Sequence, residues 1–100
     1  MKDIKAGIIG GAGYTGGELI RLLIHHPQVS VSFVHSRSNA GKKVHSIHQD
    51  LIGETNLKFT DDYTPLGDGG IDVLFLCLGH GESKKFLAEN KVSPKSRVID

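Results

Sequence analysis

The feature that most constrains the fold is a run of glycines between a short apolar stretch and an amphipathic one. Glycines stand at positions 10, 11, 13, 16 and 17, directly after the apolar residues 4–9. Glycine allows a sharp turn, lets a charged group approach the backbone and lets a helix pack closely on a strand. A ligand-free turn is the plainer interpretation. The strand expected before the glycines and the helix expected after them favour a dinucleotide-binding turn instead.

The glycine run also predicts which residues contact the ligand. Three glycines at a spacing of three are expected to shape the turn around a pyrophosphate. The unpaired N–H groups of the first helical turn, around residues 14–16, are expected to face that anion, with the positive end of the helix dipole behind them. The predicted contact residues in this segment are Gly10, Gly11, Ala12, Gly13, Tyr14, Thr15 and Gly16.

Hydrophobic periodicity predicts the remaining elements. Strands are expected at residues 4–9, 29–35, 56–60 and 71–78, and helices after position 13 and at 82–90. The first helix is expected to turn Leu19, Leu22, Leu23 and His26 inward, with Ile20 and Ile24 widening this stripe. Residues 44–51 fit one or two helical turns as well as a loop, and residues 61–70 read as turns.

Alternating strands and helices predict an α/β fold of the Rossmann-like, doubly wound kind. Its sheet should be mainly parallel, with helices on both faces. One hundred residues form one domain or part of one, here residues 1–100 as a nucleotide-binding unit. The last strand has barely begun at Arg97, so we expect the sheet to be truncated and the chain to be part of a larger protein.

The end of the second strand indicates the type of coenzyme. Twenty residues beyond the last motif glycine, an acidic residue would favour NAD, and a cation would accommodate the 2′-phosphate of NADP. This chain has Ser36, Arg37 and Ser38 there, with no carboxylate. A solvated basic loop is the plainer interpretation, but the position favours a phosphate. NADP(H) is therefore the predicted cofactor.

Composition excludes several other classes of function. A net charge of +1 indicates no nucleic-acid surface, and no apolar run approaches the ~20 residues that span a bilayer. The single cysteine and the absence of a signal-peptide pattern predict a cytoplasmic protein.

Some residues look chemically active for other reasons. Cys77 lies in an apolar run and is expected to be a core residue. His45 and His48 lack further ligands at suitable spacing, so no metal is predicted. Leu78, Gly79 and His80 follow a buried strand and are expected at the cofactor cleft, although a plain turn explains His80 equally well. These residues supply no catalytic set.

The motif GGAGYTGGEL at residues 10–19 closely resembles the N-terminal signature of the N-acetyl-γ-glutamyl-phosphate reductase family, G-A-S-G-Y-T-G-x-E-L. Supporting matches are His26-Pro27, the Ser36–Ser38 loop and the FLCLGHG run at 75–81, which is similar to F-L-A-L-P-H-G. His48, Leu51 and Gly53 fit the segment H-P-x-L-x-G, and residues 97–100 resemble the start of V-I-D-L-S. Gln49 and Gly79 stand where the family has proline.

The resemblance implies a fold, a reaction and an assembly. It implies the NADP-binding part of a homo-oligomeric oxidoreductase of arginine biosynthesis, which reduces N-acetyl-glutamyl phosphate to the semialdehyde. The family's nucleophilic cysteine lies in a G-N-P-G-C-type segment that this chain lacks, so no catalytic residue is carried over and Cys77 is not that nucleophile. A non-catalytic NAD(P)-binding regulatory module and the related aspartate-semialdehyde dehydrogenase are the alternatives.

Overall fold

The sheet of this protein has five strands, all parallel, as a computed structural model shows for residues 4–67, 70–79 and 81–99. The strand order is β3-β2-β1-β4-β5. The chain thus builds outward from β1 in one direction and then, from β4 on, in the other. This order is the Rossmann arrangement, and the predicted fold class is confirmed.

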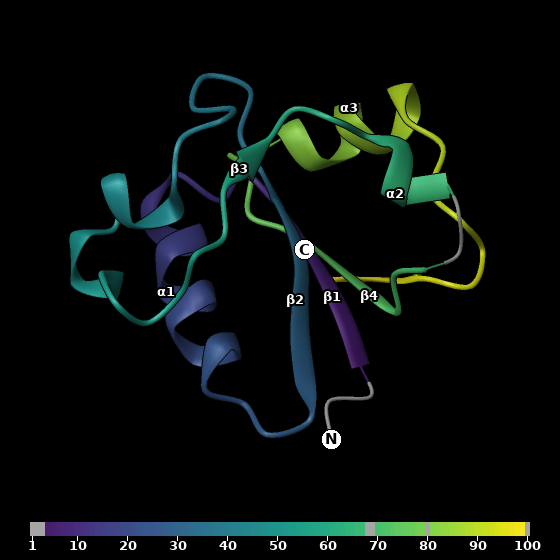
Figure 1. The fold of residues 1–100 in the computed structure, drawn as a ribbon. Helices are drawn as coiled ribbons and strands as arrows, with labels where there is room; N and C mark the ends of the chain where they lie inside the picture. Colours follow the sequence, from purple (N-terminus) through teal and green to yellow (C-terminus); the bar gives the residue numbers. More distant parts are fainter. Residues whose placement is uncertain (1–3, 68–69, 80, 100) are drawn as a thin grey trace.

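The elements follow one another with short connections (Figure 1). The strands are β1 (Ile4–Ile9), β2 (Val29–His35), β3 (Phe59–Thr60), β4 (Val73–Leu76) and β5 (Arg97–Ile99). The α-helices are α1 (Tyr14–Ile24), α2 (Thr64–Gly67) and α3 (Glu82–Glu89), and two 3-10 turns are η1 (Val44–Ser46) and η2 (Gln49–Leu51).

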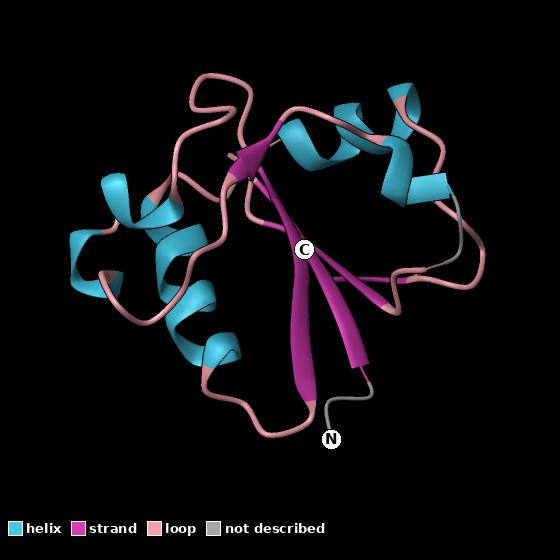
Figure 2. Cartoon of the chain, in the orientation of Figure 1, coloured by secondary structure: helices cyan, strands magenta, loops and turns pink. Residues whose placement is uncertain are grey.

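Helical segments cover both faces of the sheet (Figure 2). On one face, α1 and the two 3-10 turns enclose a core that includes Ile8, Ile20 and Phe59. On the other, α2 and α3 enclose a second core around Ile9 and Phe86. Neighbouring residues of β1 thus point into different cores, because side chains alternate across a strand. Both faces are buried, as expected of a parallel sheet.

The buried face of α1 differs from the predicted one. Gly16, Gly17, Ile20 and Leu23 are buried, whereas Leu22 is 71% exposed and His26 is also exposed. The expected stripe was wrong at these two positions, because periodicity counts only apolar side chains. Here two glycines belong to the buried face: Gly16 lets the helix start approach the glycine turn, and Gly17 leaves space for His48.

Element lengths also differ from the predictions. Residues 4–9 and 29–35 form strands over the predicted ranges, but β3 and β4 are shorter than expected. The ambiguous segment 44–51 forms two 3-10 turns, and the turn-rich segment 61–70 contains the short helix α2. A single turn carries too few residues for a periodic signal, so the sequence did not reveal α2.

Candidate functional site

An open cleft of about 670 Å³ lies at the carboxyl ends of the strands, where β1 and β4 adjoin. The chain adds strands on one side of β1 up to β3 and on the other side from β4 on. Ligands of open α/β sheets bind at this switch point. The volume is within the range of small-molecule sites. The cleft is lined by Ile9, Gly10, Ala12, Gly13, His35, Ser36, Arg37, Tyr63, Cys77, Leu78, Gly79, Glu82, Lys85, Phe86, Glu89 and Asn90.

The glycine turn between β1 and α1 forms the floor of this cleft. Gly10 has a φ of 84°, and a Cβ there would lie 2.5 Å from the carbonyl oxygen of Cys77. A Cβ on Gly16 would lie 2.6 Å from the carbonyl oxygen of Gly10. A Cβ on Gly13 would find no atom closer than 3.9 Å. The fold therefore requires Gly10 and Gly16, whereas Gly13 leaves space that a ligand could fill.

The backbone N–H groups of the turn divide into two sets. Those of Gly10 and Gly11 donate to the carbonyl oxygen of His35, at 3.1 and 3.0 Å, so they are already engaged. Those of Tyr14 and Thr15 lie in the first turn of α1, where a helix offers no internal acceptor. The residue that caps this helix is Gly13, which has no side chain that could accept a hydrogen bond from these N–H groups. N–H groups at a helix start of this kind are suited to an anion as their partner.

The loop after β2 forms a second wall. Ser36 is buried, its N–H donates to the carbonyl oxygen of Thr60 (3.0 Å), and its hydroxyl accepts a hydrogen bond from Asn39 (3.2 Å). The Ser36 hydroxyl proton is left for another acceptor. Arg37 lines the cleft and is exposed, whereas Ser38 is exposed but does not line it. The loop thus offers a guanidinium and at least one hydroxyl.

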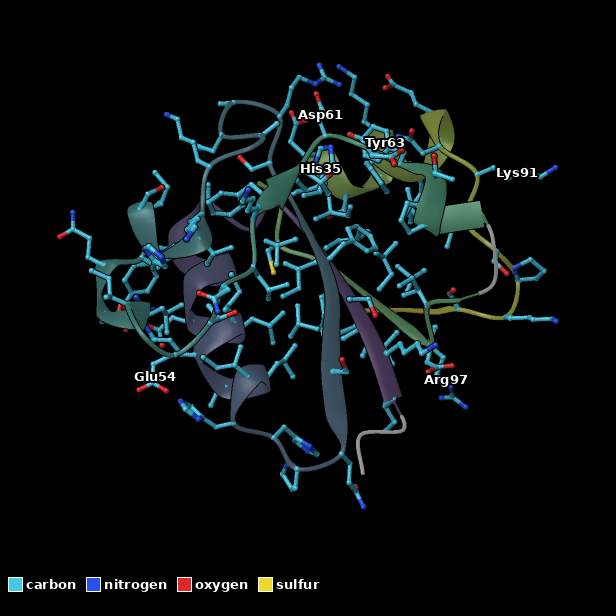
Figure 3. All side chains as sticks on the ribbon, viewed as in Figure 1. His35, Glu54, Asp61, Tyr63, Lys91 and Arg97 are labelled. Atoms are coloured by element: carbon cyan, nitrogen blue, oxygen red, sulfur yellow. The ribbon has the colours of Figure 1, made fainter. Side chains whose placement is uncertain are left out.

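His35 lies behind this loop, at the end of β2. Its ring stacks on Tyr63, with centroids 4.3 Å apart and planes 15° apart (Figure 3). The Nε2 atom is buried and has no hydrogen-bond partner in the described part of the protein. Burial lowers the pKa of His35, and the positive charge of Arg37 lowers it further. The imidazole therefore favours its neutral form.

The opposite wall is formed by the end of β4 and one face of α3. Leu78 and Gly79 line the cleft as predicted, whereas His80 lies outside the described residues. Cys77 was expected in the core, but it is half-buried and lines the cleft as well as packing on a core. The reason is that β4 ends at Leu76, so the next residue already lies at the edge of the sheet.

The structure brings together only some of the predicted contact residues. The residues that line the cleft are Gly10, Ala12, Gly13, Ser36, Arg37, Leu78 and Gly79. Gly11, Tyr14, Thr15, Gly16 and Ser38 do not, and the Tyr14 side chain is 84% exposed, so only backbone atoms of this first turn are candidates for contact.

Sequence reasoning missed the contributions of His35, Tyr63 and α3 to the walls. The α3 residues Glu82, Lys85, Phe86 and Glu89 recur at helical spacing. That spacing, directly after a strand and two glycines, was the available signal for this wall. Tyr63 gave no such signal, because it lies in a turn-rich segment.

Among the described residues, no three histidine, cysteine, aspartate or glutamate side chains gather as a possible metal site. Within the same ranges, no helix has the length and apolar character needed to cross a membrane.

The strand order and a glycine turn at the switch point define a dinucleotide-binding α/β domain of the Rossmann class. Residues 5–100 match the family described as semialdehyde dehydrogenase, NAD binding domain. The chain therefore belongs to this family.

Curated relatives and a solved structure agree with this assignment. N-acetyl-γ-glutamyl-phosphate reductases from Christiangramia forsetii and Phocaeicola vulgatus are 59% and 57% identical to this chain, each over 97% of it. The chain spans 29% of the length of each. An aspartate semialdehyde dehydrogenase with NADP from Candida albicans has a TM-score of 0.62 and 25% identity, over 86% of this chain and 27% of its own.

Proposed function

We propose that this chain is the NADP-binding part of an N-acetyl-γ-glutamyl-phosphate reductase. The observation that carries the coenzyme assignment is Arg37, an exposed cation that lines the same cleft as the glycine turn. An arginine at the end of the second strand accommodates a 2′-phosphate, whereas an acidic residue would select NAD. The relatives named as reductases support the activity, and the Candida structure supports the coenzyme.

The described residues fit this coenzyme. The open space at Gly13 and the N–H groups of Tyr14 and Thr15 suit a pyrophosphate. Arg37 and the hydroxyl groups of Ser36 and Ser38 suit the 2′-phosphate. The remaining proposed contacts are Gly10, Gly11, Ala12, Gly16, Leu78 and Gly79.

The chemistry of the bound coenzyme belongs to the complete protein. NADPH supplies a hydride when bound. The part played by the residues of this chain is to hold and orient it: the turn fixes its diphosphate, and the loop after β2 selects its phosphorylated ribose. The complete protein would then reduce N-acetyl-γ-glutamyl phosphate to the semialdehyde.

We further propose that the complete protein is a cytoplasmic homo-oligomer that acts on this small molecule. The relatives are named for a reaction of a small acyl phosphate, which supports the substrate class. The single cysteine of this chain suits a reducing compartment.

Coenzyme titration of the complete protein tests the binding proposal. We expect NADPH to bind more tightly than NADH, and Arg37→Gln to raise the Kd of NADPH by roughly ten- to a hundredfold with little change for NADH, because one charge-assisted hydrogen bond is lost. Lys42→Gln is the matched control, since Lys42 is exposed and does not line the cleft. A preference for NADH, or an unchanged Kd in Arg37→Gln, would overturn the assignment.

An activity assay on the same preparations separates the enzyme from a regulatory module. NADPH oxidation should require N-acetyl-γ-glutamyl phosphate and release inorganic phosphate. Tight NADPH binding without this reaction would support the proposed coenzyme site but refute the proposed reductase activity.

A further inference from the structure

A buried histidine outside the cleft contacts the glycine turn from behind. The Nε2 atom of His48 lies 2.7 Å from the carbonyl oxygen of Gly11, 37 residues away in the sequence. The imidazole is only 7% exposed and does not line the cleft. His48 therefore reaches the turn through the core, not through the ligand space.

The chemistry of this contact fixes which atom donates. A carbonyl oxygen is an acceptor only, so Nε2 must carry the proton and donate to Gly11. The bond is buried, and its loss would leave an unsatisfied carbonyl in the protein interior, which costs more than the bond itself contributes.

The position of His48 is determined by several neighbours. Its N–H donates to the carbonyl oxygen of Val44 (3.0 Å), and its own carbonyl accepts from Leu51 (2.9 Å). The edge of its ring meets Phe59, with centroids 6.4 Å apart. The imidazole is thus held between the two 3-10 turns and β3.

Gly17 provides the space that this ring occupies. A Cβ on Gly17 would lie 2.5 Å from Cε1 and 2.7 Å from Nδ1 of His48. The fifth glycine of the motif therefore accommodates the histidine, whereas the earlier glycines shape the turn itself. This pairing links the segment 44–51 to the start of α1.

We infer that His48 is a positioning residue for the coenzyme, acting through Gly11; this rests on the proposed function. The carbonyl oxygen of His35 holds the N–H groups of Gly10 and Gly11, and His48 holds the Gly11 carbonyl from the other side. The N–H groups of Gly10 and Gly11 and the carbonyl group of Gly11 thus all have hydrogen-bond partners within the protein, without a bound dinucleotide. A binding loop held in its bound shape loses less entropy on association, so affinity depends on this support.

Three substitutions in the complete protein test the inference by NADPH titration. His48→Gln places an amide NH2 at the position of Nε2, His48→Asn places it at the position of Nδ1, and His48→Leu removes the donor. We expect the Kd of NADPH to rise about tenfold or more in His48→Leu and His48→Asn, and to stay within about threefold in His48→Gln. His45→Gln is the matched control, since His45 is a nearby histidine in η1 and does not line the cleft.

If the role of His48 were purely structural, its variants would be less stable, but the Kd of NADPH for the folded variants would not depend on the position of the donor. The titrations are therefore made well below the Tm of each variant, where all are folded. If His48→Leu does not fold, the Gln and Asn variants decide, because they carry the same polar group at different places. Equal affinities for these two would overturn the inference.

The outcome for Arg37 distinguishes the two proposals. If Arg37→Gln weakens NADPH binding while every His48 variant binds like the parent, the positioning role fails and the coenzyme site stands. If the parent protein does not bind NADPH, both fail.

Discussion

The α-carbon of Gly16 faces the carbonyl oxygen of Gly10 so closely that a methyl group on Gly16 would lie 2.6 Å from that oxygen. The same methyl group would lie 2.7 Å from the α-carbon of Gly11. These atoms are backbone and cannot rotate away. The start of α1 is thus seated directly on the turn that follows β1, the same turn that lines the cleft through Gly10, Ala12 and Gly13.

Gly16→Ala should therefore damage both stability and binding. The added methyl group must push α1 away from the turn, and overpacking of this kind costs about 1–3 kcal/mol. We expect a lower free energy of unfolding in urea and a Kd of NADPH raised at least tenfold in the complete protein. Unchanged stability would show that the helix can shift at no cost, contrary to the contact described.

Gly13→Ala separates binding from folding at the same turn. The nearest atom to its added methyl group is 3.9 Å away, and the φ of Gly13 is −79°, which any residue adopts. We expect a free energy of unfolding within about 0.5 kcal/mol of the parent. The Kd of NADPH should rise about tenfold if a pyrophosphate approaches this backbone. Full affinity in Gly13→Ala would argue against that approach.

These glycines show how far the sequence could predict the site. The motif located the turn, the helix start and the type of ligand, because it requires backbone without side chains. It could not assign each glycine its task, since the task depends on partners far along the chain. Gly17 faces His48, and a methyl group on Gly11 would overlap Val34 of β2. Neither partner is visible from spacing alone.

The cleft walls illustrate the same limit. Arg37 was predictable because its distance from the glycines is set by one βαβ unit. Tyr63 was not, since its place over His35 depends on the path of the chain after β3. The outward-facing Leu22 was mispredicted for a related reason: periodicity could not recognise glycine as a packing surface.

The ion pair between Arg21 and Asp50 links α1 to the 3-10 turn η2. Nε and Nη2 of Arg21 bind the two carboxylate oxygens at 2.5 and 2.8 Å. This hydrogen bonding lowers the pKa of Asp50 below its ordinary value of 3.8. A carboxylate with a depressed pKa contributes stability above its unfolded pKa and loses it as the pH falls through the folded value.

Asp50→Asn should therefore lower the Tm slightly at pH 7, and the difference from the parent should shrink toward pH 3. The effect is expected to be small because both side chains are accessible to solvent. Arg21→Lys is the comparison, since it keeps the charge but loses the two-pronged hydrogen bond. Thermal unfolding at both pH values measures the difference, and a Tm difference that grows on acidification would refute the ion-pair explanation.

The buried imidazole of His35 contributes a pH dependence of the same sign, but at a higher pH than Asp50 does. Its pKa is lowered by burial and by the charge of Arg37, so the folded protein takes up a proton at lower pH than the unfolded chain does. The unfolded state therefore binds more protons as the pH falls below the ordinary histidine value of 6.5. His35 therefore makes the folded state less stable as the pH falls from about 7 toward 5.

His35→Phe removes that titration while keeping an aromatic ring against Tyr63. The carbonyl oxygen of residue 35, which holds the N–H groups of Gly10 and Gly11, is main chain and is retained. We expect the free energy of unfolding of His35→Phe to fall less steeply than that of the parent between pH 7 and pH 5, as measured by urea unfolding of the complete protein at several pH values. His45→Phe is the control, because it exchanges a histidine for a phenyl ring away from the stack of His35 on Tyr63. Parallel pH profiles for His35→Phe and the parent would mean that the imidazole is protonated as readily in the folded protein as in the unfolded chain, despite its burial beneath Tyr63.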